Sequence, residues 1–330
     1  MSFSLSLGGM GSFGHSGHAP SPFDAINGGR LAGGSGSHPL HAVTIEELLQ
    51  PTEGNVGGSI TFDKEIRVGD PITGRIDLIA NSQIKARKAY LRLVGLRLVE
   101  ERKTTSTRVG NTTTTQSWVE ADGTLFEQDP FLEPAIPTEL APGQQFSATF
   151  AIPGPPLGPP TAHLGEAIVA WAVEVRWDIP MGTDAHVATL LPIVQNPDLI
   201  AAGVGAQGGQ SMLASIDVGG GTISVDSPLP AKPGSTMVVR ATWPRAHSGA
   251  GRIELHRVSN VPNATVPVIA TVPIADGELA SGAAHAELLL PDDLQPSFDG
   301  AGLQLGYSIR VLVDRRFMPD DAIERPVAVA

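Results

Sequence analysis

The chain carries one pattern of strands twice, and this duplication limits the folds that it can adopt. Residues 57–63 read GGSITFD and residues 220–226 read GGTISVD, so the two segments lie 163 positions apart. Three further pairs follow in the same order: 89–93 with 251–255, 150–153 with 288–291, and 171–175 with 307–311. An internal repeat of this kind predicts two tandem domains that share one fold.

Hydrophobic and polar residues alternate with a period of two in both copies. In residues 171–178, Trp, Val, Val and Trp alternate with Ala, Glu, Arg and Asp, and residues 72–78, 146–152 and 307–314 behave similarly. This period is typical of strands that bury one face. After Thr52, no segment with helical period is longer than about ten residues. We therefore expect an all-β fold of two tandem antiparallel β-sandwiches with immunoglobulin-like topology.

Composition divides the chain into four parts. Residues 1–51 begin with a stretch rich in Gly, Ser and His that cannot bury enough apolar surface to order itself. We predict a disordered tail there, in which a short helix at 43–50 would need a docking surface. The first sandwich is expected at 52–197, an Ala/Gly-rich linker at 198–210, and the second sandwich at 211–330.

The first copy contains about 25 extra residues, since the offset between the copies falls from 162 to 138 after residue 93. Within this insertion, residues 104–117 include nine hydroxyl residues in fourteen. Gly110-Asn111 is a suitable two-residue hairpin turn between β-prone arms. We interpret residues 96–126 as a protruding hairpin, with an unstructured loop as the alternative. The predicted partner-binding residues on it are Arg108, Asn111, Thr112 and Trp118.

Several motifs resemble the arrestin-like superfamily, closest in kind to its bacterial sporulation-control proteins. These are GGSITFDKEIRVGDPITGRIDL at 57–78, LAPGQQFSATFAIPGPPLGPP at 140–160, and the strands at 88–98 and 170–177, with LLLPDDLQPS and YSIRVLV repeating the ending at 288–297 and 307–313. The resemblance implies two tandem arrestin domains in a non-catalytic adaptor or regulator. Arrestins also carry a buried charged cluster that senses phosphate. No such cluster is evident here, because the sequence after Trp177 lacks Arg and Lys until well past the linker.

A basic region precedes the hairpin. Lys85, Arg87, Lys88 and Arg92 begin a run of 19 positions that holds seven of the 22 basic residues in the chain. Such a region could bind an acidic segment of a partner or a lipid headgroup surface. The alternative is that these residues lie on both faces of an edge strand, where lysine discourages unwanted pairing.

The remaining features argue against most other functions. A formal charge of −12 disfavours nucleic acid as a partner, and the absence of cysteine excludes disulfides and thiol chemistry. There is no GxSxG, HExxH or Walker A motif, so we expect no catalytic residues and no enzyme activity. The match to GxGxxG at 203–208 precedes no helix-forming sequence, and we expect no cofactor. Four histidines of the tail could bind zinc or nickel, but we interpret the tail as solvated and expect no metal site: His15, His18, His38 and His41.

These observations predict a cytoplasmic protein, since no apolar run spans a membrane and the N-terminus lacks a signal-peptide pattern. The leading hypothesis is a protein-binding adaptor that uses sheet edges, the hairpin and the cleft between domains. Any membrane contact would be peripheral. The alternative is a self-assembling structural subunit of a shell, fibre or secretion apparatus. A carbohydrate-binding module is a weaker alternative, because the chain has only 16 aromatic residues and most occupy predicted core positions.

Overall fold

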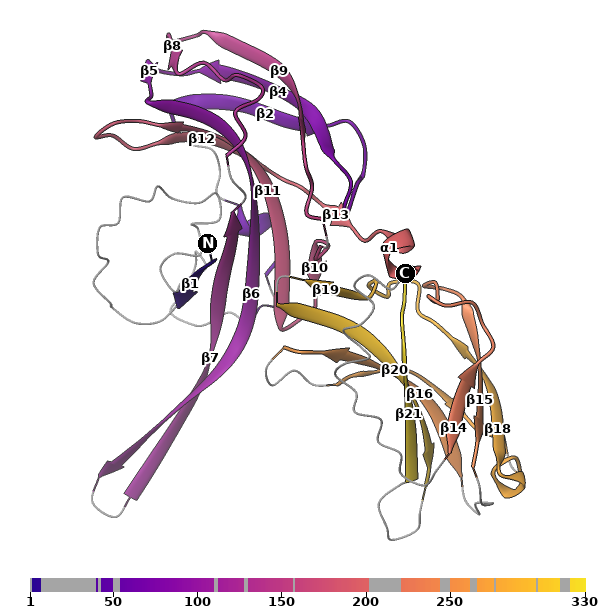
Figure 1. The fold of residues 1–330 in the computed structure, drawn as a ribbon. Coiled ribbons are helices and arrows are strands. Elements are labelled where there is room, and N and C mark those ends of the chain that lie inside the picture. Colours follow the sequence, from indigo (N-terminus) through magenta and orange to yellow (C-terminus); the bar gives the residue numbers. More distant parts are fainter. Residues whose placement is uncertain are drawn as a thin grey trace. The chain divides into compact units, whose positions relative to one another are not determined.

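A computed structural model shows a chain built almost entirely of β-strands (Figure 1). It describes residues 2–6, 40, 43–49, 54–109, 112–127, 130–156, 158–201, 221–243, 250–261, 266–275, 277–300, 302–314 and 321–330. The chain divides into two compact units. Unit 1 comprises Met1–Pro156, Pro160–Val194 and Val261–Asn263, and unit 2 comprises Leu157–Pro159, Gln195–Asn260 and Ala264–Ala330.

The larger sheet of unit 1 is antiparallel and has the strand order β1-β7-β6-β11-β10, with β12 also paired to β11. Its strands are β1 (Ser2–Ser6), β6 (Lys88–Val109), β7 (Thr112–Glu127), β10 (Ala162–His163), β11 (Ala167–Asp178) and β12 (Ala185–Leu190). The central strand β11 is buried on both faces from Ala167 to Trp177. Both faces of this sheet are therefore covered near its centre.

The smaller sheet of unit 1 has the order β2-β4-β9, formed by β2 (Val56–Phe62), β4 (Ile72–Ala80) and β9 (Gln145–Ile152). Two short pairs complete the unit, β3 (Ile66–Arg67) with β13 (Ile193–Val194), and β5 (Ile84–Lys85) with β8 (Glu139–Leu140). One close approach in the larger sheet requires glycine. A Cβ at Gly95 would lie 2.6 Å from the ring of Trp171 on the neighbouring strand.

Unit 2 repeats the plan with two antiparallel sheets. One consists of β14 (Thr222–Val225), β15 (Thr236–Thr242) and β18 (Ala283–Leu289), in that order. The other has the order β17-β16-β20-β19, with β21 (Asp321–Val327) paired to β20. Its strands are β16 (Gly251–Ser259), β17 (Val268–Pro273), β19 (Phe298–Gly300) and β20 (Leu303–Val313).

One hydrophobic cluster fills the space between the two sheets of unit 2. It includes Met237 and Val239 from the first sheet and Leu255, Tyr307 and Ile309 from the second. The Tyr307 hydroxyl donates a hydrogen bond of 2.8 Å to the carbonyl of Gln295. Burial raises the pKa of this hydroxyl to about 12, so it stays protonated. The alternation in residues 307–313 thus produces a strand with one face in the core.

The fold class expected from the sequence is confirmed, because consecutive antiparallel β-sheets form both units. The predicted linker begins with a short helix, α1 (Pro197–Ala201), and residues 202–210, with the GxGxxG motif, lie outside the described residues. Most of the predicted disordered tail, residues 7–39, also lies outside them, as do His15, His18, His38 and His41. Near the end of that tail, a short 3₁₀ helix at Glu46–Leu48 packs against the larger sheet of unit 1.

Candidate functional site

The insertion of the first copy forms the long hairpin β6–β7. The two strands pair from Val94 and Glu127 to Val109 and Thr112 at the tip. On the other side of β6, β11 pairs only as far as Val99, and on the other side of β7, β1 pairs only with 122–126. In the described part of the chain, residues 100–109 and 112–121 therefore form a two-stranded ribbon with no further strand beside it (Figure 1).

Three of the four predicted partner-binding residues lie on the ribbon: Arg108, Thr112 and Trp118. Arg108 is exposed and lies opposite the exposed Thr113, one position from the pair that Thr112 makes with Val109. Trp118 lies opposite Lys103, farther from the tip, and Asn111 lies outside the described residues. The structure thus places Arg108 and Thr112 together at the end of the ribbon and separates Trp118 from them.

The chemistry of the ribbon suits binding to another chain. Its pairs near the tip join hydroxyl residues, such as Thr107 with Thr114 and Ser106 with Thr115. Cross-strand pairs of threonine stabilise a sheet modestly, and an isolated two-stranded hairpin is marginal in water. The outer edges of both strands carry backbone groups that a further strand can pair with.

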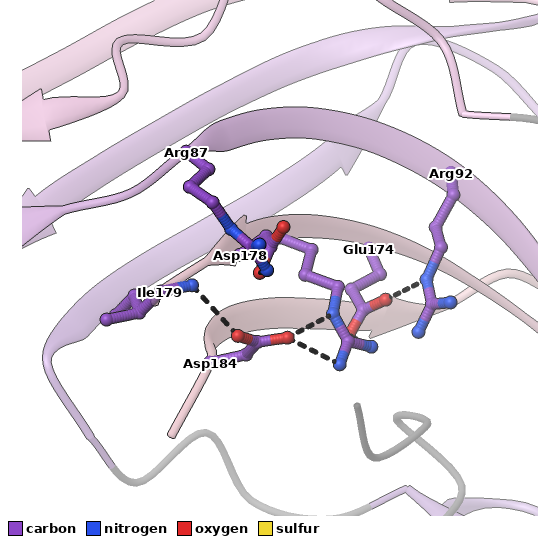
Figure 2. A network of polar contacts seen from close by, with 7 residues as sticks. Arg87, Arg92, Glu174, Asp178, Ile179 and Asp184 are labelled. Atoms are coloured by element: carbon purple, nitrogen blue, oxygen red, sulfur yellow. Dashed lines mark hydrogen bonds and ion pairs between the residues drawn. The ribbon is translucent and has the colours of Figure 1, made fainter. Parts of the chain in front are cut away.

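A second polar feature lies on the larger sheet of unit 1, around a buried ion pair. Arg92 on β6 and Glu174 on β11 occupy directly opposite positions and form an ion pair. Their side chains are 7% and 0% exposed. Figure 2 shows the two groups pointing toward each other between the strands. The pair therefore links β6 to β11 in a place that water does not reach.

The network continues through Arg176 to the start of β12. The guanidinium of Arg176 donates to one carboxylate oxygen of Asp184, at 3.0 Å from Nη2 and 3.2 Å from Nε. Its Nη1 also lies 4.0 Å from a carboxylate oxygen of Glu174. The second oxygen of Asp184 accepts a hydrogen bond of 2.9 Å from the backbone N–H of Ile179 (Figure 2). One acid thus holds the turn between β11 and β12 against Arg176.

The predicted basic region is divided by the fold. Lys85, Arg87 and Lys88 are exposed, whereas Arg92 is buried in the ion pair with Glu174. Arg87 pairs with Asp178 at 2.8 Å, and the hydrogen bond that its guanidinium donates to that carboxylate raises the pKa of Arg87. The interpretation of Arg92 as part of an exposed basic surface is wrong, because its strand is covered on both faces there.

The charges of the buried network cancel, since two arginines face two carboxylates. A buried charge is costly unless it is paired, so this balance lets the charged groups stay inside. Burial lowers the pKa of His186, which lies opposite Arg176 in the register, and the positive charges of Arg176 and Arg92 lower it further. Burial also raises the pKa of Tyr90, with Arg176 and Arg92 opposing that effect. The arrangement favours a neutral histidine and a protonated tyrosine beside the ion pairs.

The ion pairs of this network join β6 to β11 and β11 to the start of β12. Each of its carboxylates is bound by an arginine, which leaves neither placed as a free base. Within the residues that the structure describes, no three His, Asp or Glu side chains gather where they could hold a metal ion. No described helix is both long and apolar enough to cross a membrane.

The stretch after Trp177 shows no sign of a buried charged cluster, because all but one of the cluster's charged residues precede Trp177 in the chain. The alternation in residues 171–178 predicts that Glu174 and Arg176 lie on the polar face of a strand, and Arg92 is predicted as part of the basic region. The available signal was the run Ala167–Ala172, which is apolar at every position. A continuous apolar run indicates a strand buried on both faces, and charges that follow it directly have to be paired.

Comparison with known proteins finds similarity at the level of structure and none at the level of sequence. No protein-family model and no curated protein sequence matches the chain. Among solved structures, it is similar to the crystal structure of Spo0M, a sporulation control protein from Bacillus subtilis. The two align over 83% of this chain and 91% of that chain, with 12% identity and a TM-score of 0.25. A similarity at this level assigns no function.

Proposed function

We propose that this chain is a non-catalytic adaptor or regulator that binds other proteins, with the ribbon of residues 100–109 and 112–121 as its main contact surface. The observation that supports this proposal is the length of β6–β7 beyond the last strand that pairs with it. Residues 104–117 of the ribbon pair only with each other among the described strands, so the sheet of unit 1 does not depend on them. Its two outer edges can accept a partner strand.

The register gives a clean way to remove the ribbon. Lys103 and Trp118 lie directly opposite each other, so residues 104–117 can be replaced by Asn-Gly, which favours a two-residue turn. The full chain and this shortened variant are used to capture partners from a lysate of the cells that produce the protein. A matched control, Leu132→Ser with Met181→Ser, changes two exposed apolar side chains elsewhere on unit 1.

We expect the full chain and the control to retain the same partner, and the shortened variant to lose it. Circular dichroism and the melting temperature should be nearly unchanged, because the removed residues pair only with each other among the described strands. A partner that the shortened variant retains equally well would show that the ribbon is not the contact surface.

Self-assembly is the second candidate function, since an open strand edge can pair with another copy of the same chain. Light scattering after size-exclusion chromatography, over a hundredfold range of protein concentration, separates the two. The adaptor proposal predicts a constant molar mass. Species that grow with concentration and disappear in the shortened variant would favour an assembly subunit instead.

A further inference from the structure

The outer face of the larger sheet of unit 1 carries an apolar surface that the smaller sheet does not cover. Val94, Leu96 and Leu98 on β6 lie directly opposite Ala172, Ala170 and Ile168 on β11. All six are buried, and the hydrophobic cluster that contains them includes no residue of β2, β4 or β9. Some other part of the chain therefore covers this face.

The cover is a short segment that precedes the first strand of the smaller sheet. Leu40, Val43 and Leu48 belong to the same cluster and are 1%, 4% and 0% exposed, while Ile45 and Leu49 pack at its edge. The residues between these positions, Thr44, Glu46 and Glu47, are exposed. The segment is thus amphipathic, with one apolar side on the sheet and an acidic side facing away.

Two side chains of the sheet hold the backbone of this segment. The Nε2 atom of His163 lies 3.0 Å from the carbonyl oxygen of Leu40 and 2.9 Å from that of Val43. The backbone N–H of Gly165 points at Nδ1 of the same ring, which leaves Nε2 as the donor to both carbonyls. The backbone N–H of Leu40 in turn donates to the carboxylate of Glu100.

The segment is held in the manner of a bound peptide. The hydrogen bonds in which residues 43–49 join one backbone group to another all stay within the segment. The N–H groups of Val43, Glu47, Leu48 and Leu49 each donate to the carbonyl three positions before them. Thr44 donates its backbone N–H to Glu47, as in one half of a capping box. An element this short has no stability of its own, so its conformation depends on the face beneath it.

We propose that this face is a peptide-binding site, and that residue 40 and residues 43–49 occupy it as an exchangeable ligand of the same chain. The external partner is a segment of another protein with the same chemistry: apolar side chains at the spacing of Leu40, Val43 and Leu48, and acidic residues on the opposite side. His163 and Glu100 recognise its backbone. Because the internal segment is tethered, its effective concentration is high and it lowers the apparent affinity of any external one. The inference does not depend on the proposed role of the ribbon as a contact surface, although Glu100, the first residue of the ribbon, is one of the two anchors.

A fluorescent synthetic peptide of residues 38–50 tests the proposal by anisotropy against full-length proteins. In one protein, Leu40→Asp, Val43→Asp and Leu48→Asp release the internal segment, and in its matched control Thr44→Asp changes an exposed position. We expect the released protein to bind the peptide at least about tenfold more tightly than the wild type, given tether concentrations near the millimolar range. The control should behave as the wild type does.

The substitution His163→Ala tests whether the peptide binds to this face of the sheet. Adding His163→Ala to the released protein should weaken peptide binding at least about fivefold, because one side chain there contacts two carbonyls. Equal binding to the wild type and the released protein, or no binding to a released protein with a native circular dichroism spectrum, would overturn the proposal. So would binding that is insensitive to His163→Ala.

Hydrogen exchange on the wild-type chain tests the same proposal if the released protein does not fold. An exchangeable segment opens locally, so the amides of Val43, Glu47 and Leu48 should exchange at least about tenfold faster than those of β11. Exchange at the same rate as the amides of β11 would show that the segment leaves the sheet only when unit 1 unfolds, and the proposal would be wrong.

Discussion

The same position of the two repeated units carries an ion-pair site with reversed charges. In unit 1, Arg92 on the first strand lies opposite Glu174 on the second. In unit 2, Glu254 on β16 lies opposite Arg310 on β20. The repeat found in the sequence aligns these positions, since 254 follows 92 by 162 and 310 follows 174 by 136. The common element is compensated charge at this point of the sheet, and the sign on each strand is free to change.

The two sites differ in how the charges are shared. In unit 1, the acid and the base of opposite strands bind each other, away from water. In unit 2, Glu254 accepts from Arg252 at 2.7 Å and pairs with His256 at 2.7 Å on its own strand, while Arg310 pairs with Glu324 on β21 at 3.3 Å. Arg252 and Arg310 are each 33% exposed. The arginines of the site in unit 1 are therefore buried, whereas those of the site in unit 2 are partly exposed to water.

The largest expected loss of stability follows from breaking the buried ion pair of Arg92 and Glu174 in unit 1. Glu174→Gln leaves Arg92 without its compensating charge, and breaking a buried pair on one side costs about 3–5 kcal/mol. The matched change in unit 2, Glu254→Gln, should cost about 1–2 kcal/mol, because Arg252 can turn toward water. Urea unfolding of both variants measures the two costs. Equal costs would contradict the comparison.

Reversing the polarity of unit 1 sharpens the comparison. Arg92→Glu with Glu174→Arg gives it the charge order of unit 2. Each single change places two like charges together, so the double variant should be more stable than the sum of the single costs implies, by about 1–3 kcal/mol of coupling. A double-mutant cycle in urea measures this. Additive costs would mean that the two side chains do not interact in solution.

The ion pair of Arg310 on β20 with Glu324 on β21 should contribute less to stability. Arg310→Gln removes a contact in which the arginine is partly solvated, so we expect a loss of about 1 kcal/mol or less in the unfolding of unit 2. The loss should shrink in 1 M salt, whereas the cost of Glu174→Gln should not, since salt screens exposed charges more than buried ones. If the loss for Arg310→Gln were large and independent of salt, the Arg310–Glu324 pair would behave as the buried Arg92–Glu174 pair does, and the comparison would be contradicted.

The smallest expected effect is on the pH dependence of stability. The pKa of His186 is lowered from its ordinary value of 6.5, so the unfolded chain binds a proton more readily, and unit 1 loses stability as pH falls below about 6.5. His186→Asn should remove this part of the loss in melting curves between pH 7.5 and pH 5. A variant with the same pH profile as the wild type would show that His186 does not contribute.

Glu254 gives the corresponding prediction for unit 2. Burial, the largest single influence, raises its pKa, but the hydrogen bonds from Arg252 and His256 together lower it below its ordinary value of 4.5. The stability that this carboxylate contributes is therefore present above about pH 4.5 and is lost as pH falls further. Glu254→Gln should flatten the acid side of the unfolding profile of unit 2, and an unchanged slope there would contradict the assignment.

The sequence predicted the strands better than it predicted what covers them. The alternation in residues 171–178 correctly places Trp171 and Trp177 on one face and Glu174 and Arg176 on the other. It could not show that the second face is buried, because part of the cover of that face comes from residues far away along the chain, such as Leu40 and Leu48. A period-two pattern predicts the face of the sheet on which a side chain lies, but it does not predict what covers that face.

The short element before the first sandwich shows the same limit. The sequence of residues 43–50 predicts a marginal helix that needs a docking surface, and the structure supplies that surface on β6 and β11. Nothing in the segment identifies His163 or Glu100 as its anchors, since both lie more than fifty positions away. The ribbon was easier to anticipate, because a turn dipeptide between β-prone arms is a local signal.

The most direct test of the adaptor proposal is hydrogen exchange on the full chain, with and without a captured partner. The proposal predicts that protection on binding concentrates in residues 100–109 and 112–121, where β6 and β7 have no other strand beside them. Protection spread over the other strands of the two units, with the ribbon unchanged, would contradict it.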